Sequence, residues 1–203
     1  MRRFERAQPG ELVHVDIKKL GNIPTGGGDR TQGRAQGRRN RTATAADTSR
    51  NAHGNPKLGH GYLHTAIDDH SRVAYTEILA DERKETAAGF WERAHAYFAS
   101  AGIAVERVLT DNGACYQSHT WRDLLRGQGI KHKRTRPYRP QTNGKVERFH
   151  RTLTDEWAYA RPYRPGAERR EAFTGWLHHY HHCESWGGWS TGSTPRSAAL
   201  PRS

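Results

Sequence analysis

The sequence of 203 residues is short of cysteine and has no long apolar run. Its two cysteines, Cys115 and Cys183, are too few for a disulfide-stabilised scaffold, and their spacing excludes a Cys-x-x-Cys metal pair, so we expect both to be reduced. No segment approaches the roughly 20 apolar residues that a membrane span needs. The basic N-terminus leads into Pro9 and Gly10 instead of an apolar segment, which is not typical of a secretory signal. We therefore expect a cytoplasmic protein without a membrane partner.

Acidic residues are also scarce relative to basic ones. The chain has 21 Asp and Glu against 33 Lys and Arg, which gives a formal net charge of +12. Such an excess favours binding to a polyanion, because each neutralised phosphate releases a condensed counterion. The alternative is a basic protein whose charge serves only its solubility. We expect nucleic acid as the partner. The location of the charges decides between this interpretation and the solubility alternative.

Alternating apolar and polar residues predict three strands in the N-terminal half. Residues 11–18 place Val13 and Val15 on one face and Asp16 on the other. Residues 61–68 and 72–79, joined by Asp-His-Ser, predict an antiparallel hairpin. Between the first strand and this hairpin, residues 21–60 are rich in Gly, Arg and Thr. We predict a flexible basic loop there, which is either simply solvated or follows a DNA backbone.

The C-terminal half alternates helical and extended patterns. The predicted elements are a helix over 84–100, a strand over 105–110, a short helix over 119–126, a strand over 130–135, a helix with an apolar stripe at Val146, Phe149, Leu153 and Trp157, and a last helix over 167–182. This order indicates an α/β fold with helices packed on a mixed sheet. We expect a linker over 1–10, one core domain over 11–182 and an irregular tail over 183–203.

Three acidic residues stand at positions suited to chemistry. Asp16 lies on the polar face of the first strand, Asp111 ends the fourth strand, and Glu147 lies in the first turn of a helix. In α/β sheets such positions meet at one crevice, so we expect the three carboxylates to converge. Their mutual repulsion would need a divalent cation to offset it, and hard oxygen ligands favour Mg²⁺ or Mn²⁺. Two such ions promote in-line displacement at a phosphodiester, which indicates DNA or RNA as the substrate.

Basic residues are concentrated around Glu147. Between Ile130 and Arg151 there are eight Lys and Arg and one acid, and we expect this region to bind the phosphate backbone. The predicted DNA-binding residues are Lys131, Lys133, Arg134, Arg136, Arg139, Lys145, Arg148, His150 and Arg151.

Four segments surround these acids: ELVHVDIKKLG with Asp16, the hairpin GYLHTAIDDHSRVAY, VLTDNGACY with Asp111, and RPYRPQTNGKVERFHRTLTDEW with Glu147. Together they resemble the catalytic core of the integrase-type DDE transposases of bacterial insertion sequences, which are relatives of retroviral integrases. The 35 residues between Asp111 and Glu147 equal the D,D(35)E spacing of that family. The resemblance extends over residues 5–180.

This resemblance implies a ribonuclease H-like fold with a five-stranded mixed sheet and helices on both sides. It implies that Asp16, Asp111 and Glu147 are the catalytic carboxylates and hold two Mg²⁺ or Mn²⁺ ions. The implied reaction is nicking at the 3′ ends of a transposon, followed by attack of the freed 3′-hydroxyl on target DNA. The implied partner is double-stranded DNA, bound by a homo-oligomer.

The sequence departs from the family pattern in two places. The family usually has a helix-turn-helix region before the core, and this sequence begins almost at the first strand, so we expect either a truncated element or end recognition by another chain. After Tyr180, the family's Tyr-Asn and Arg-Pro-His stretch is replaced by HHCESWGGWSTGSTPRS, which indicates a frameshift or decay near Cys183.

Simpler interpretations of the same residues remain open. Asp16 suits a surface ion pair, Asp111 suits a turn, and Glu147 suits the start of a helix, where a negative charge complements the helix dipole. Asp68 and Asp69 are better explained by the hairpin turn than as further ligands. At the level of function, the alternatives are a ribonuclease H-like nuclease that stops at hydrolysis and a non-catalytic transposase remnant that binds DNA.

Overall fold

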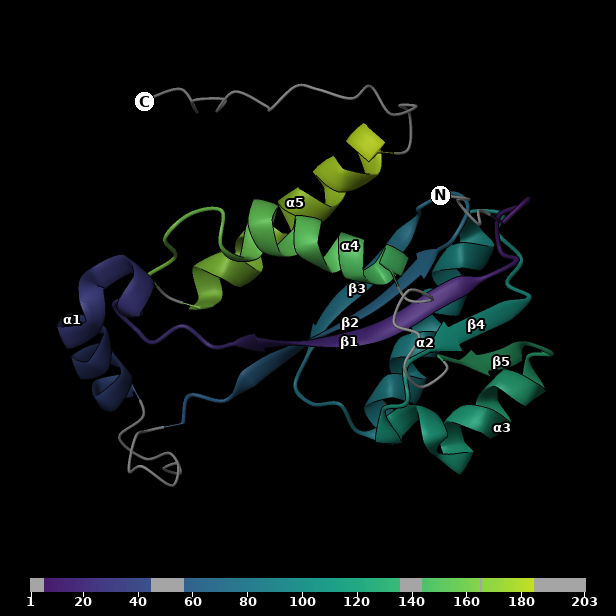
Figure 1. Ribbon diagram of the computed structural model, residues 1–203, viewed down its shortest axis with the longest axis horizontal. Coiled ribbons are helices and arrows are strands. Elements are labelled where there is room, and N and C mark those ends of the chain that lie inside the picture. The colour runs from purple at the N-terminus through teal and green to yellow at the C-terminus, as the bar shows by residue number, and fades with distance from the viewer. Residues whose placement is uncertain (1–5, 45–56, 136–143, 165, 185–203) are drawn as a thin grey trace.

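The structure, a computed structural model, describes residues 6–44, 57–135, 144–164 and 166–184 (Figure 1). The elements are β1 (Val13–Gly21), α1 (Asp29–Thr44), β2 (His60–Asp68), β3 (Ala74–Leu79), α2 (Lys84–Ser100), β4 (Arg107–Thr110), the 3₁₀ turn η1 (Ala114–Gln117), α3 (His119–Gly127), β5 (Lys131–Arg134), α4 (Gly144–Leu153), the π-helical turn η3 (Thr154–Ala158) and α5 (Gly166–Glu184). Each strand and helix predicted from the sequence is present close to its predicted position. None of the described helices is long and apolar enough to cross a membrane.

The strands form one five-stranded mixed sheet in the order β3-β2-β1-β4-β5. β1 pairs antiparallel with β2 and parallel with β4. β2 and β3 form the predicted antiparallel hairpin, whose turn is held by Asp68, since the Ser71 N–H and hydroxyl donate to its carboxylate at 2.6 and 2.7 Å. β1 is therefore the central strand and is covered on both faces.

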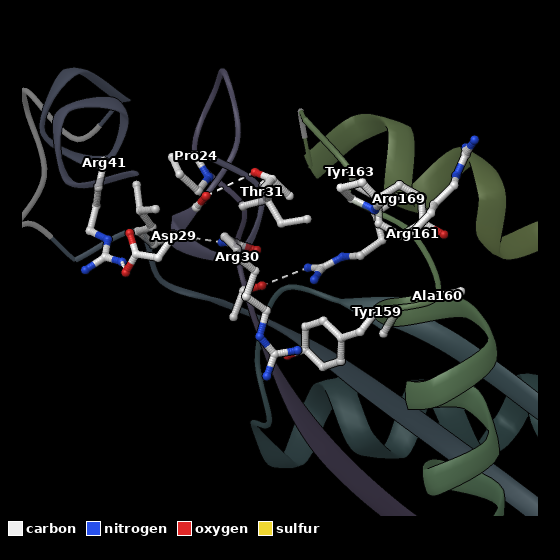
Figure 2. Close-up of a pocket in the computed structure, with 17 residues that line it drawn as sticks. Pro24, Asp29, Arg30, Thr31, Arg41, Tyr159, Ala160, Arg161, Tyr163 and Arg169 are labelled. Atoms are coloured by element: carbon white, nitrogen blue, oxygen red, sulfur yellow. Dashed lines mark hydrogen bonds and ion pairs between the residues drawn. The ribbon is translucent and has the colours of Figure 1, made fainter. Parts of the chain in front are cut away.

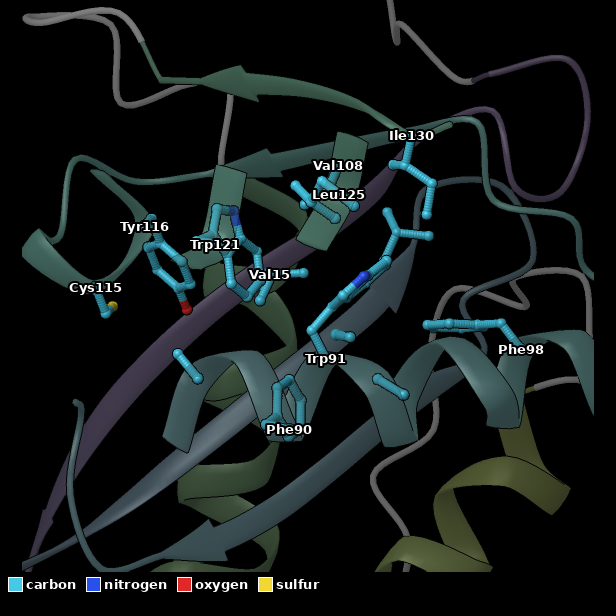
Figure 3. Close-up of a cluster of buried hydrophobic side chains, with 14 of the residues drawn as sticks. Val15, Phe90, Trp91, Phe98, Val108, Cys115, Tyr116, Trp121, Leu125 and Ile130 are labelled. Atoms are coloured by element: carbon cyan, nitrogen blue, oxygen red, sulfur yellow. The ribbon is translucent and has the colours of Figure 1, made fainter. Parts of the chain in front are cut away.

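Helices α2 and α3 cover one face of the sheet, and this face holds an aromatic core (Figure 3). The odd-numbered positions of β1, including Val13 and Val15, pack against Phe90 and Trp91 of α2 and Trp121 of α3. All five side chains are fully buried. The helical spacing over 84–100 therefore predicted the buried face of α2, because apolar residues three and four apart lie on one side of a helix.

Helices α4 and α5 cover the opposite face (Figure 1). Every member of the predicted apolar stripe of α4 is buried: Val146, Phe149, Leu153 and Trp157. They pack against Leu20 of β1, Leu63 of β2 and Phe173 of α5. The stripe therefore holds α4 against the sheet, and this contact places Glu147 above the central strands.

The predicted flexible loop over 21–60 is wrong for residues 29–44, which form the helix α1. Its two helical segments meet at Gly33, whose φ of 76° interrupts the regular backbone. The sequence pattern missed it because α1 has almost no buried side chain, so no apolar period marks it. Residues 45–56 of the predicted loop and 185–203 of the predicted tail lie outside the described residues.

Candidate active site

Asp16 on β1 lies next to Asp111, which directly follows the neighbouring strand β4. The parallel pairing of β1 and β4 sets Val15 opposite Thr110, the last residue of β4, and an aspartate follows each of them. Because side chains alternate along a strand, Asp16 points to the face opposite Val15, where α4 and α5 pack. The sheet register therefore brings together two of the three acids predicted from the sequence.

The environment of Asp111 raises its pKa. Burial is the largest cause, and the negative charge of Asp16 adds to it, whereas the Gly113 N–H acts in the opposite direction by donating to Asp111 Oδ1 at 2.8 Å. A Cβ at Gly113 would lie 3.0 Å from that oxygen, so glycine leaves room for this contact. The charge of Asp16 thus disfavours the charged form of Asp111, and a cation would relieve this repulsion.

Helix α4 contacts Asp16 through His150. His150 Nδ1 lies 3.4 Å from Asp16 Oδ2, and Nε2 lies 3.1 Å from Thr65 Oγ1 on β2. Thr65 is directly opposite Asp16 in the β1–β2 register. His150 is only 4% exposed. The sequence predicted that it contacts DNA, whereas its imidazole lies between α4 and the sheet, with Asp16 as its neighbour.

Glu147 occupies the turn of α4 that precedes His150, and its side chain is exposed. Side chains three apart on a helix lie about 5–6 Å from one another at Cβ, so Glu147 lies one turn from His150, the residue of α4 that contacts Asp16. Within the described ranges, no group of three His, Cys, Asp or Glu side chains is placed to hold a metal ion. The structure thus pairs two acids and does not bring the third into a three-ligand group with them.

A buried ion-pair network fixes the first turn of α4. Lys145 Nζ lies 2.7 Å from Asp69 Oδ2 and donates to the Asp69 carbonyl at 2.9 Å. His14 Nε2 lies 2.9 Å from the other Asp69 oxygen. Burial alone would raise the pKa of the Asp69 carboxyl, but the hydrogen bonds from His14 and Lys145 and the Lys145 charge outweigh it and hold that pKa well below its usual value. Lys145 thus pairs with Asp69 in the structure, and its contact with phosphate stays a prediction.

The other predicted DNA-binding residues form two groups. Lys131, Lys133 and Arg134 are exposed on the edge strand β5, and Arg148 and Arg151 are exposed on α4. Arg136 and Arg139 lie outside the described residues.

The sequence was compared with the profiles of known protein families, and two profiles match it. A profile described as an integrase core domain matches residues 6–140, and a second integrase core domain profile matches residues 128–183. The chain belongs to the integrase core domain family. The two matched regions together contain Asp16, Asp111 and Glu147.

Relatives of this integrase core occur in transposon polyproteins. A retrovirus-related Pol polyprotein from transposon TNT 1-94 of Nicotiana tabacum is 33% identical over 99 residues, which is 48% of this chain and 7% of that protein. The transposon Tf2-3 polyprotein of Schizosaccharomyces pombe is 31% identical over 99 residues, which is 47% of this chain and 7% of that protein. The chain thus matches a small part of these curated relatives. They support an integrase-type transposase, and origin from a bacterial insertion sequence stays a prediction.

Solved structures show the same fold. A chain of the simian T-cell lymphotropic virus intasome in complex with PP2A regulatory subunit B56 gamma matches with a TM-score of 0.59 at 18% identity, over 98% of this chain and 62% of that one. The catalytic core domain of BIV integrase matches with a TM-score of 0.54 at 17% identity, over 89% and 88% of the two chains. The fold of this integrase core is therefore ribonuclease H-like, as the sequence resemblance implied.

Two features of the site were not identified from the sequence. The burial of His150 follows from its position four residues after Val146, on the apolar side of α4. The role of Asp69 was hidden because a turn already explains an aspartate there. A buried partner 76 residues away along the chain gives no local signal.

Proposed function

We propose that this integrase core carries out metal-dependent nicking of DNA 3′ ends and strand transfer into target DNA. The single observation that carries the proposal is the adjacency of Asp16 and Asp111 beneath the helix that bears Glu147. The family membership supports the class of reaction, since integrase-type enzymes are polynucleotidyl transferases.

The residues present fit a divalent cation. Asp16, Asp111 and Glu147 supply only hard carboxylate oxygens, which suit Mg²⁺ or Mn²⁺. Burial raises the pKa of Asp111 and the Asp16 charge adds to this, which supports the proposal that a cation binds between the two carboxylates. When bound, two such ions would activate the attacking oxygen and stabilise the leaving oxygen at the phosphodiester. For Glu147 to join them, its side chain would turn from solvent towards the sheet.

The remaining residues orient the acids and bind DNA. The Gly113 N–H holds Asp111 Oδ1, and His150 Nδ1 faces Asp16 Oδ2, which leaves one oxygen of each aspartate for a ligand. The exposed cations of β5 and α4 flank this position, so we infer that the DNA backbone runs over them as double-stranded DNA. A homo-oligomer would hold two transposon ends at once.

Strand transfer of a transposon end, labelled at the 5′ end of the strand that is nicked and joined, into a plasmid tests the proposal. Asp16→Asn, Asp111→Asn and Glu147→Gln should each remove nicking and transfer in Mg²⁺ or Mn²⁺ by at least about 10²-fold, because each removes a charge that acts on the transition state. DNA affinity in the absence of metal should stay within a few-fold. Asp155→Asn, an exposed acid on η3, is the matched control and should remain active.

The outcomes separate the two alternatives. Hydrolysis of the labelled end without joined product would assign a nuclease. DNA binding that is sensitive to salt, with no product in any metal, would assign a non-catalytic remnant. Full activity in any one of the three acid variants would contradict the assignment of that residue.

A further inference from the structure

A cavity of about 540 Å³ lies between α1 and the segment that joins η3 to α5 (Figure 2). Tyr159 and Tyr163 line it together with apolar side chains. Four arginines also line it: Arg30, Arg41, Arg161 and Arg169. Gly21, which lines the cavity, is five residues after Asp16 on β1. At the usual rise of about 3.3 Å per strand residue, the two residues are about 16 Å apart. The cavity is thus a separate site.

The α1 wall of the cavity is held in place by its own contacts. Arg41 Nη2 pairs with Asp29 Oδ2 at 2.9 Å, and Asn40 Nδ2 donates to the Gly27 carbonyl at 3.0 Å. Gly37 is buried against Asp29, since a Cβ there would lie 2.2 Å from Asp29 Oδ1. Asp29 is the one acid among the residues of α1, and Arg41 neutralises it. With Asp29 paired to Arg41, Arg30 gives this wall a net positive charge.

Arg169 brings a buried positive charge to the opposite wall. Arg169 is 5% exposed, and its Nη2 donates to the neutral Gly21 carbonyl at 2.8 Å. Burial lowers the pKa of its guanidinium, and the other groups that act on that pKa are Tyr159, Tyr163 and Arg170. No carboxylate of the described residues is among them. A buried charge without a counter-charge is costly, so this position favours an anion in the cavity.

An exposed aromatic surface lies at the same cavity. The guanidinium of Arg30 lies 4.4 Å from the centre of the Tyr159 ring, and Figure 2 shows Arg30 reaching from α1 over that ring. Tyr159 is 46% exposed, which makes it the one exposed large hydrophobic residue in the described part of the chain. Aromatic rings and arginine planes at the surface are the groups on which unpaired nucleobases stack.

We propose that this cavity binds one unpaired nucleotide of a DNA strand, with its phosphate at Arg169 and its base against Arg30 and Tyr159. The volume lies in the range of about 300–1,000 Å³ that is usual for small-ligand pockets, so one nucleotide fits and a duplex does not. Outside the cavity, Arg34, Arg38 and Arg39 of α1 are exposed, where the next phosphates of the same strand would lie. The proposal rests on the proposed function, since the strand belongs to the DNA on which the protein acts.

Fluorescence anisotropy with two labelled DNAs tests the proposal. One DNA is a blunt duplex, and the other is the same duplex with a short single-stranded overhang. The unaltered chain should bind the overhang DNA more tightly. Tyr159→Ala should weaken overhang binding on the order of tenfold, the typical loss of one base–aromatic stack, and leave blunt binding unchanged. Tyr159→Phe keeps the ring and should retain the preference.

Two arginines of α1 form a matched pair that separates the cavity from general charge. Arg30→Ala and Arg34→Ala each remove one cation, so both should flatten the salt dependence of DNA binding by a similar amount. Only Arg30→Ala should remove the overhang preference, because Arg34 does not line the cavity. Equal loss of the preference in both variants would overturn the proposal.

The remaining outcomes distinguish this inference from the proposed function. Equal affinity for the two DNAs, with strand transfer intact, would overturn the nucleotide site alone. Competition by a free deoxynucleoside monophosphate as strong as that by the overhang DNA would assign the cavity to free nucleotides and overturn the strand proposal. Absence of any DNA binding would overturn both. Overhang preference retained by Asp111→Asn would support the cavity independently of catalysis.

Discussion

The two faces of the central sheet are built from different chemistry. The face under α2 and α3 is filled mainly by aromatic and aliphatic side chains such as Trp91 and Trp121. The face under α4 and α5 also buries an ion-pair network, in which His14 contacts Asp69, and it buries His150, which contacts Asp16. The first face stabilises the fold mainly through apolar burial, which does not depend on the orientation of the groups. The second must satisfy each buried polar group, and in return it places charged groups accurately.

The largest expected effect is on the aromatic face. Trp91 is fully buried, and its indole N–H donates to Gln128 Oε1 at 2.8 Å. Trp91→Ala should lower the free energy of unfolding by about 3–5 kcal/mol, because it leaves a cavity and an unpaired amide. Urea unfolding followed by circular dichroism measures this loss. Trp176→Ala on α5, where the side chain is only partly buried, is the control and should cost clearly less. Equal losses would mean that apolar burial does not stabilise the aromatic face more than the face under α4 and α5.

A smaller effect is expected from the ion-pair network on the polar face. Asp69→Asn leaves Lys145 without its counter-charge and should lower the free energy of unfolding by about 3 kcal/mol. This loss is at the low end of the range for a buried ion pair, because the Lys145 side chain is 22% exposed. The pKa of Asp69 is lower in the folded chain than in the unfolded chain, where it is about 3.9. Ionised Asp69 therefore contributes fully to the free energy of unfolding when the pH is above about 3.9, and this contribution is lost as the pH falls below that value.

Unfolding measured at neutral pH and again below about pH 4 checks this sign. The unaltered chain should lose more stability over that interval than Asp69→Asn does. Asp123→Asn on α3, an exposed acid on the other face, should keep the full pH dependence. An Asp69→Asn chain with the same acid sensitivity as the unaltered chain would place the titrating groups elsewhere.

The smallest effect concerns DNA binding and leaves stability unchanged. Lys133→Ala combined with Arg148→Ala removes two exposed cations, one from β5 and one from α4. If each contacts one phosphate, the slope of log affinity against log salt should fall by about 1.8. Arg122→Ala combined with Arg126→Ala on α3 removes the same charge from the other face and should change the slope little. A larger change in the α3 variant would place DNA on the aromatic face.

Much of the fold could be predicted because apolar residues repeat with the period of each element. The alternation around Val13 and Val15 gave β1, and the spacing of Phe90 and Trp91 gave α2. Helix α1 could not be found this way. Its contacts are a buried glycine, an ion pair to Asp29 and hydrogen bonds to loop carbonyls, and none of these leaves a hydrophobic period.

The candidate site was predictable to the extent that it depends on sheet register. Asp16 and Asp111 are adjacent because each follows a buried strand residue, a feature that is visible in the sequence. The position of the Glu147 side chain depends on its rotamer, which no sequence period fixes. Likewise, the pairing of Lys145 with Asp69 joins residues far apart in the chain, so the sequence placed Lys145 at the DNA surface and gave no sign of its ion pair with Asp69.

The central strand sets the positions of all these groups at once. His14, Asp16 and Gly21 of β1 contact, in turn, the Asp69 network, the His150 imidazole and the Arg169 guanidinium. A slip of one residue between β1 and its neighbours would turn every side chain of the strand to the other face. Asp16 would then point into the aromatic core, and Val15 or Ile17 would take its place beneath α4. Any insertion or deletion within β1 should therefore abolish folding and chemistry together.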